Sequence, residues 1–238
     1  MPLNNSKGNM FDFVTHTWNP IKGACFHDCS YCYMKRWGDG RLKAPRLVKS
    51  ELKADLGNDN FIFIGSSIDI FSNEIPQDWI IQVLCKTEIY DKNKYLLQTK
   101  SPNNYFLYLP KYSTIDYGNI QPDNFILSTT IETNNYFYEI MKNSPHPYAR
   151  VQAMQELPKK YKRMLTIEPI MKFDLEKLLK LVMAIKPEQI NVGADTQNKN
   201  LPEPSAYEVE KLIFCLKDYA KVNIKSNLNR ILKGNEKK

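Results

Sequence analysis

Three of the chain's five cysteines lie within eight residues, in the stretch GACFHDCSYCYMKRW from Gly23 to Trp37. Cys25, Cys29 and Cys32 have the spacing C-x3-C-x2-C. Three thiolates can bind three irons of a 4Fe–4S cluster, which leaves the fourth iron open to another ligand. The spacing therefore predicts cysteine ligands for a metal centre in this loop.

A single zinc ion is the alternative metal for these cysteines. A structural zinc site normally has four protein ligands, commonly in two pairs separated by a dozen or more residues, and no second pair follows here. His27 would complete a Cys3His set, although four ligands within eight residues strain the usual spacings. A redox sensor would leave the third cysteine unexplained. Cys85 and Cys215 fall in amphipathic helical patterns, which predicts buried core thiols.

Regular elements must position this loop, and the rest of the chain alternates between apolar runs and helical patterns. The apolar runs predict strands at residues 60–67, 94–100, 123–132, 163–170, 188–195 and 221–228. The helical patterns lie between them, at residues 77–90, 101–109, 147–157, 174–185 and 205–220. This alternation predicts an α/β fold with a parallel sheet and outer helices. Five or six units are too few for an eight-unit barrel, so an open or partial barrel is expected.

Polar residues follow several of these buried runs directly. They are Gly65-Ser66-Ser67, Thr99-Lys100, Ser128-Thr129, Glu168 and Gly193. Ligands of open α/β sheets gather at the carboxyl ends of the strands, so the site is expected there. A structural role is the alternative for the two serines, since serine is a good helix N-cap residue.

Length and composition predict one cytoplasmic domain over residues 1–238, with a cluster loop at about 23–37 and a basic tail at about 229–238. No run of eighteen apolar residues predicts a membrane span, and the N-terminus has no signal-peptide core. Clustered cysteines in the cytosol more often bind metal than form disulfides. The net charge of +7 and the pI of about 9.0 favour nucleic-acid contact only weakly.

The cysteine motif, with Tyr31 directly before its last cysteine, resembles that of the radical S-adenosylmethionine (SAM) superfamily. The resemblance covers the chain from about Thr15 to Leu228 and implies a partial (β/α)6 barrel, a type of partial TIM barrel. It also implies that the open iron binds SAM. Reductive cleavage of SAM would then give a 5′-deoxyadenosyl radical that abstracts hydrogen from a substrate.

Two smaller families are also similar. The segments THTWNPIKGACFHDCSYCYM, FIGSSIDIF, LLQTKSP, TTIETN, LTIEPI and NVGADT resemble a small phage-associated radical-SAM-like family of unassigned function. CSYCYM, together with Lys100 and Ser128, is similar to the spore photoproduct lyases, which repair thymine dimers. Those lyases use a cysteine after the second strand as hydrogen donor, whereas this chain has Ser66 and Ser67 there. Lyase activity is therefore not expected, and a nucleic-acid substrate stays open.

The resemblance implies a role for each candidate residue. Cys25, Cys29 and Cys32 would bind the cluster, and Tyr31 would flank the cluster and SAM. Gly65, Ser66 and Ser67 occupy the place of a Gly-Gly-Glu motif that accepts hydrogen bonds from the methionyl ammonium. Because the glutamate is absent, hydroxyls, carbonyls or Asp69 must accept them. The remaining SAM contacts would come from Lys100 to the carboxylate, from Ser128 and Glu132 to the ribose or methionine, and from Glu168 in the pocket wall.

Other basic residues, namely Arg150, Arg163 and Lys225, either meet phosphate or form a solvated face. The leading hypothesis is a single-cluster radical SAM enzyme with an external one-electron donor such as flavodoxin or ferredoxin, and with a substrate that is a nucleic acid, a protein or a small molecule. One alternative is a zinc- or cluster-stabilised nucleic-acid-binding module without catalysis. Another is a degenerate radical SAM scaffold, suggested by the missing glutamate.

Overall fold

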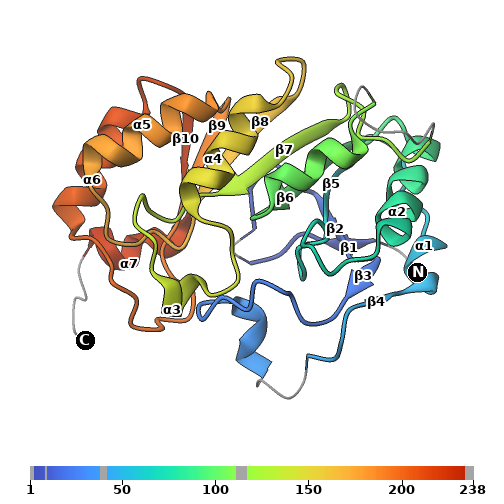
Figure 1. Ribbon diagram of the computed structural model, residues 1–238, viewed down its shortest axis with the longest axis horizontal. Coiled ribbons are helices and arrows are strands. Elements are labelled where there is room, and N and C mark those ends of the chain that lie inside the picture. Colours follow the sequence, from blue (N-terminus) through green and yellow to red (C-terminus); the bar gives the residue numbers. More distant parts are fainter. Residues whose placement is uncertain (1–2, 9, 38–41, 111–116, 234–238) are drawn as a thin grey trace.

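The computed structural model describes residues 3–8, 10–37, 42–110 and 117–233, and a single eight-stranded sheet forms its centre (Figure 1). The strand order is β1-β2-β5-β6-β7-β8-β9-β10. These strands are β1 (Asn4–Asn5), β2 (His16–Trp18), β5 (Phe61–Ile64), β6 (Lys94–Thr99), β7 (Phe125–Thr130), β8 (Lys162–Ile167), β9 (Gln189–Val192) and β10 (Lys221–Ile224). All neighbours from β2 to β10 pair in parallel, and β1 pairs antiparallel with β2. The predicted parallel sheet is confirmed.

Most helices follow the sequence pattern closely. The longer ones are α2 (Gln77–Ile89), α4 (Pro147–Glu156), α5 (Leu175–Ile185) and α6 (Ala206–Leu216), each within a predicted range. Residues 102–108 form a 3-10 helix, η3 (Pro102–Tyr108), within the predicted helix at 101–109. The short elements are β3 (Ile21–Lys22), β4 (Arg46–Leu47), η1 (Tyr33–Trp37), α1 (Lys49–Leu52), α3 (Tyr138–Met141), η4 (Ser226–Leu228) and α7 (Asn229–Leu232).

Local sequence signals fix where the helices begin. Ser205 and Glu208 form a capping box at the start of α6, in which each side chain bonds the other's backbone N–H. Asp174 caps α5 by accepting from the Lys177 N–H. At α4 the fixed φ of Pro147 suits the first helical position. These signals place the helices between successive parallel strands, as right-handed βαβ units require.

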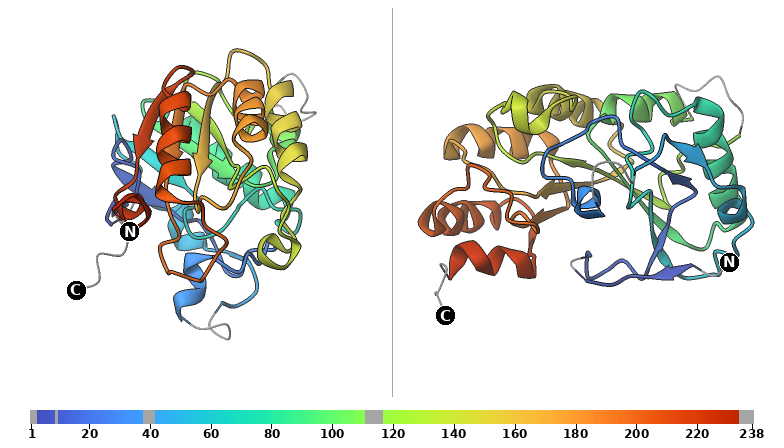
Figure 2. Two further views of the ribbon diagram at one scale, coloured as in Figure 1. Left: turned by 90° about the vertical axis from the view of Figure 1, so that its left-hand side faces the viewer. Right: turned by 90° about the horizontal axis from the view of Figure 1, so that it is seen from below.

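Most residues of β5 to β9 are buried, because the helices cover one face of the sheet and the N-terminal segment covers part of the other. In β5, Ile62 and Ile64 join the main core under the helices, while Phe63 points to the other face. There it packs with Phe11 and Val14 of the N-terminal segment, in a second cluster that also contains Leu96 and Met164. Figure 2 shows the helices along the outer side of the curved sheet and the blue N-terminal segment on its inner side. The second cluster thus closes one end of the inner face.

The sheet is open in the described part of the chain, because β1 and β10 lie at opposite ends of the strand order. The first residues of the predicted basic tail at about 229–238 are helical. Residues 229–232 form α7, where Arg230 pairs with Glu203, and residues 234–238 lie outside the described residues. Among the helices described, none has the length and apolar character needed to cross a bilayer.

Candidate active site

The three clustered cysteines line one cavity of about 800 Å³. The loop that carries them lies between β3 and η1, after β2, a strand of three residues that the sequence pattern did not reveal. Much of the remaining cavity wall comes from the carboxyl ends of the parallel strands, as the sheet topology requires, and part of it from the N-terminal segment at Lys7, Gly8, Met10 and Phe11. All three thiols are free of disulfides. The predicted loop therefore faces the predicted end of the sheet.

The cysteine loop is held by a segment more than a hundred residues away, at α3 and the turn that follows it. Several contacts join the two: Ser30 N–H donates to the Ile140 carbonyl at 2.9 Å, Asn143 N–H to the His27 carbonyl at 3.2 Å, and Asn143 Nδ2 to the Phe26 carbonyl at 2.9 Å. Lys142 pairs with the Asp28 carboxylate at 2.8 Å, and Cys29 Sγ lies beside Ser144 Oγ at 3.1 Å. Tertiary contacts, rather than a metal alone, give this loop its shape.

Asp69 ties the cysteine loop to the end of β6. Its Oδ2 accepts hydrogen bonds from His27 Nε2 at 2.8 Å, Thr99 Oγ1 at 2.9 Å and Lys100 N–H at 2.8 Å, and its Oδ1 accepts from Phe71 N–H. Burial alone would raise the pKa of Asp69, but the hydrogen bond and charge of His27 outweigh it and lower that pKa. Asp69 therefore serves as a clamp, and its Oδ1, which accepts one hydrogen bond, keeps acceptor capacity at the cavity wall.

The Gly65-Ser66-Ser67 turn faces the cavity and is anchored by Asn19. The Asn19 Oδ1 atom accepts from Ser66 Oγ at 3.2 Å and from the Ser67 N–H and hydroxyl at 3.0 Å. Gly65 has φ +75°, and a Cβ atom there would lie 2.7 Å from Ile70 Cγ2, so only glycine fits this turn. Asn19 directly precedes a proline after β2, a position that we did not identify as part of the site.

A buried charge network lies behind the cysteines. Tyr31 donates a short hydrogen bond to Glu132 Oε1, and Arg150 Nη1 donates to Glu132 Oε2 at 2.8 Å. Lys100 Nζ lies 3.5 Å from Glu132 Oε1 and 5.5 Å from the centre of the Tyr31 ring. Glu132 and Arg150 are 0% exposed. The network connects the residue before Cys32 to the end of β7.

The network also fixes protonation states. Burial works against the ionised form of Glu132, but Arg150 and Lys100 outweigh it and lower the pKa of Glu132. Burial likewise opposes the charged form of Lys100, while Glu132 raises its pKa. Burial and the Glu132 charge raise the pKa of Tyr31 well above its usual range. Lys100 is therefore a cation at neutral pH, and it lines the cavity.

The lowered pKa values of Glu132 and Asp69 predict acid sensitivity of the cluster-free protein. A carboxyl group whose pKa is lower in the folded state stabilises the fold above its unfolded pKa, and this stability is lost as the pH falls through the folded pKa. We expect the free energy of unfolding to be level above about pH 5 and to fall progressively below about pH 4.5. Urea unfolding between about pH 6 and 3 measures it. In Glu132→Gln the fall should be shallower, and an unchanged slope would contradict the assignment.

A second charge pair stands at the β8 and β10 side of the same cavity. Glu168 accepts from Lys225 Nζ and from Asn227 Nδ2, each at 2.7 Å. Lys225 also lies 4.8 Å from the centre of the Phe11 ring. Glu168 and Lys225 line the cavity, as Glu168 was expected to do. Lys225 is buried in this ion pair, so the prediction that it forms part of a solvent-exposed face is wrong.

Because Gly193 has no side chain, the Glu168 carboxylate can occupy the space beside its Cα atom. A Cβ atom on residue 193 would lie 2.7 Å from both Glu168 Cδ and Oε1. We expect Gly193→Ala to destabilise the protein by about 1–3 kcal/mol through this overlap. The free energy of unfolding in urea measures the cost. In a Glu168→Ala background the same substitution should cost much less, and an equal cost there would refute the explanation.

Several predicted positions lie away from the cavity. Ser128 and Glu132 do not line it: Ser128 is 0% exposed within β7, and Glu132 lies in the network behind the wall. A direct contact of either side chain with SAM therefore has no support in the cavity lining. Arg150 and Arg163 are buried and bond backbone carbonyls, so neither forms a solvated face. Cys85 and Cys215 are half-buried rather than buried.

The donor set determines which metal group fits the loop. No group of three or more His, Cys, Asp or Glu side chains in the described chain is arranged to hold one metal ion. A 4Fe–4S cluster does not require such convergence, since each cysteine binds a different iron. Burial raises the pKa of Cys25 to about 12 and also raises that of Cys32. Metal charge must therefore compensate these thiols before they bind as thiolates; it is the donor set, three cysteines on the wall of one cavity, that suits a cluster.

Comparison with known proteins gives a family and a set of similar folds. The family profile described as "Protein of unknown function (DUF5131)" matches residues 9–196. Nothing in this match connects the chain with phages, so that part of the expected resemblance has no support. Comparison with curated proteins gives no match.

Several similar solved structures are spore photoproduct lyases. A double mutant with bound AdoMet and dinucleoside spore photoproduct has a TM-score of 0.63 at 10% identity, and the match covers 90% of this chain and 78% of the lyase. The lyase complexed with dinucleoside spore photoproduct also has a TM-score of 0.63, at 11% identity, with 91% and 78% covered. The predicted α/β fold of the radical SAM type is therefore confirmed, as an open sheet rather than a closed barrel.

Proposed function

Since the chain belongs to the DUF5131 family, whose description assigns no activity, we propose from the site and the fold that it is a radical SAM enzyme with one 4Fe–4S cluster. One observation carries the proposal: three cysteines at C-x3-C-x2-C spacing line a single cavity at the carboxyl ends of a radical-SAM-type sheet. The bound cluster and SAM would supply hydrogen-abstracting radical chemistry through reductive cleavage of SAM.

The residues of the cavity divide into those for the cluster and those for SAM. Cys25, Cys29 and Cys32 would bind the cluster. The Lys100 ammonium, a point charge with three donors, would pair with the SAM carboxylate. Its contact with Glu132 is 3.5 Å long, which leaves donors for a ligand. Gly65, Ser66 and Ser67 would offer backbone carbonyl and hydroxyl oxygens to the methionyl ammonium, in place of the absent glutamate.

The proposed work of the protein is to position groups and exclude water. Tyr31, held by Glu132, would keep Cys29 and Cys32 turned toward the cavity. Phe11 and Phe63 close the inner end of the cavity with apolar surface, which keeps bulk water from a radical. The cavity volume of about 800 Å³ lies in the range for one small-molecule ligand. A large substrate would therefore approach from outside, and a one-electron donor such as flavodoxin or ferredoxin would reduce the cluster.

The substrate of the structural neighbours gives a starting point only. Those lyases are solved with dinucleoside spore photoproduct. A nucleic-acid substrate is part of our proposal, whereas lyase activity is not, since no cysteine stands at residues 65–67.

The test is anaerobic reconstitution with iron and sulfide, reduction with dithionite in the presence of SAM, and detection of 5′-deoxyadenosine by mass spectrometry. Formation of 5′-deoxyadenosine is the expected result. A loaded cluster that never cleaves SAM would refute the enzyme and leave a cluster-bearing scaffold.

The second candidate is a zinc-stabilised nucleic-acid-binding module, favoured only by the basic charge of the chain. Metal analysis of the purified protein separates the two. One zinc per chain and no visible absorbance would indicate this module, and iron with sulfide would exclude it.

A further inference from the structure

A row of aromatic rings lies on the surface beside the cysteine loop, outside the cavity. Tyr138, Tyr136, His146 and Tyr148 follow one another with ring centres 6.3, 4.8 and 5.5 Å apart. The three tyrosines are 65%, 36% and 47% exposed in that order, and His146 is exposed as well. Exposed aromatic residues scattered singly need no explanation, but a continuous row does.

This row is linked to the loop that carries the cysteines through the turn after α3. Tyr136 donates from its hydroxyl to the backbone carbonyls of Lys142 and Ser144, and Ser144 Oγ lies 3.1 Å from Cys29 Sγ. His146 is fixed at the other side, since its Nδ1 accepts from the Tyr148 N–H and caps α4. The rings are therefore held on rigid backbone next to the candidate active site.

An open groove continues the row between α4 and α5. Its volume is about 550 Å³, and its lining is neutral: His146, Tyr148, Ala149, Val151, Gln152, Gln155, Leu181 and Ala184. The exposed Gln155 amide offers both donors and an acceptor, while Gln152 Nε2 donates to Glu156. Aromatic faces beside neutral amides can stack on and hydrogen-bond to flat heterocycles.

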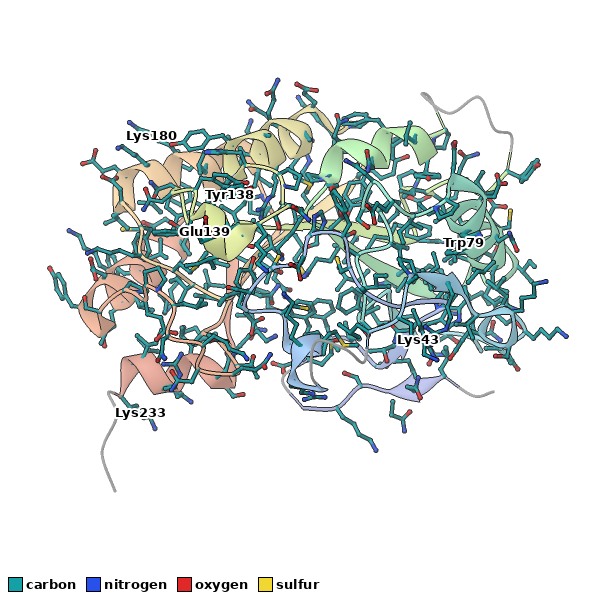
Figure 3. The ribbon with its side chains drawn as sticks, turned by 60° about the horizontal axis from the view of Figure 1, so that its bottom comes forward. Lys43, Trp79, Tyr138, Glu139, Lys180 and Lys233 are labelled. Carbon is teal, nitrogen blue, oxygen red and sulfur yellow. The ribbon has the colours of Figure 1, made fainter. Side chains whose placement is uncertain are left out.

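Cations flank the groove on α5. Lys177 and Lys180 are exposed and stand one helical turn before Leu181 and Ala184, which line it. Figure 3 shows Lys180 and Tyr138 toward the same end of the molecule. Exposed acids lie on this surface too: Glu139 beside Tyr138, Glu156, which Gln152 engages, and Asp174 and Glu176 at the start of α5, next to Lys177. With the chain's net charge of +7, this arrangement suits a polyanion with flat bases.

We propose that the row Tyr138–Tyr136–His146–Tyr148 and the α4–α5 groove bind single-stranded nucleic acid. Stacking of bases on aromatic side chains is sequence-tolerant and combines with backbone contacts to cations, which matches what this surface offers. Duplex DNA keeps its base faces covered and cannot use the rings. The binding does not depend on the cluster or on SAM, so it can be tested in the cluster-free protein.

The test is fluorescence anisotropy of a labelled single-stranded oligonucleotide of about 12 nucleotides, with a duplex of the same length for comparison. We expect Tyr138→Ala and Tyr148→Ala each to raise the Kd for the single strand at least about fivefold. The matched control is Tyr207→Ala on α6, which is 71% exposed and lies outside the groove. It should leave the Kd unchanged. Lys180→Gln should reduce the slope of log Kd against log salt by about one.

Three results would overturn the proposal. They are equal affinity of the ring variants and the Tyr207→Ala control, duplex binding as tight as single-strand binding, and no binding at about 50 mM salt. An unchanged affinity in the ring variants would also be the result if the row instead contacts a protein partner. If the reconstituted protein does not cleave SAM, the proposed function is refuted. Binding of single-stranded nucleic acid by the cluster-free protein would still support this inference.

Discussion

A Cys29→Ser protein is expected to hold no intact 4Fe–4S cluster and to form no detectable 5′-deoxyadenosine. Only three cysteines face the cavity, and the other two of the chain, Cys85 and Cys215, do not line it. Removing one therefore leaves an iron without its thiolate. Loss of a group that merely orients a metal ligand costs about 10–100-fold in affinity or activity, so loss of a ligand should exceed about 100-fold.

Iron and sulfide content, visible absorbance and 5′-deoxyadenosine are measured on parallel reconstitutions. The matched control is Cys85→Ser, which changes a half-buried thiol on α2 outside the cavity. It should load about four irons per chain, as we expect of the unaltered protein. A Cys29→Ser protein that loads and cleaves SAM like the control would exclude Cys29 as a ligand, and with it the proposed site.

The second large effect is expected at the buried carboxylate behind the cysteines. Glu132→Leu would leave the Arg150 guanidinium buried without its counter-ion and the Tyr31 hydroxyl without its acceptor. Removing one partner of a buried pair typically costs about 3–5 kcal/mol. The cluster-free protein should lose about this much free energy of unfolding in urea.

Two further variants separate charge from shape. In Glu132→Leu/Arg150→Met both charges of the pair are gone, and a large part of the stability should return, because well-packed apolar residues often replace a buried pair without cost. Glu203→Gln removes one partner of the more exposed Arg230 pair and should change stability by at most about 1 kcal/mol. A Glu132→Leu cost as small as that of Glu203→Gln would rule out the network as a major source of stability.

The features predicted correctly from the sequence are those that depend on local residue patterns. The strands β5 to β9 are largely apolar runs because most of their residues are buried, whereas β10 is half exposed; the helix starts have capping residues or proline at the expected positions. The cysteine motif is visible because its three members lie within eight residues. β2 escaped notice because three residues carry no periodicity.

Contacts between distant residues set the rest of the site. Tyr31 and Glu132 are 101 positions apart, so their bond, and the burial of Glu132, could not be read from spacing. The same holds for Asp69, whose Oδ2 accepts from His27 in the cysteine loop and from Lys100 at the end of β6. Arg150 shows this limit of sequence-based prediction most clearly, because nothing in the local sequence distinguishes a buried arginine from a solvent-exposed one. Its partners are supplied entirely by the fold.

The attachment of the cysteine loop to α3 and its following turn has a consequence for the order of assembly. In small zinc domains the unfolded chain collapses around its metal, so maturation and folding are one event. Here backbone hydrogen bonds to Ile140 and from Asn143 join the loop to a distant part of the chain. Much of the loop's conformational entropy is thus lost when the chain folds. If the loop binds a cluster as we propose, we expect the cluster-free protein to fold, and a lost cluster to be rebuilt without refolding of the chain.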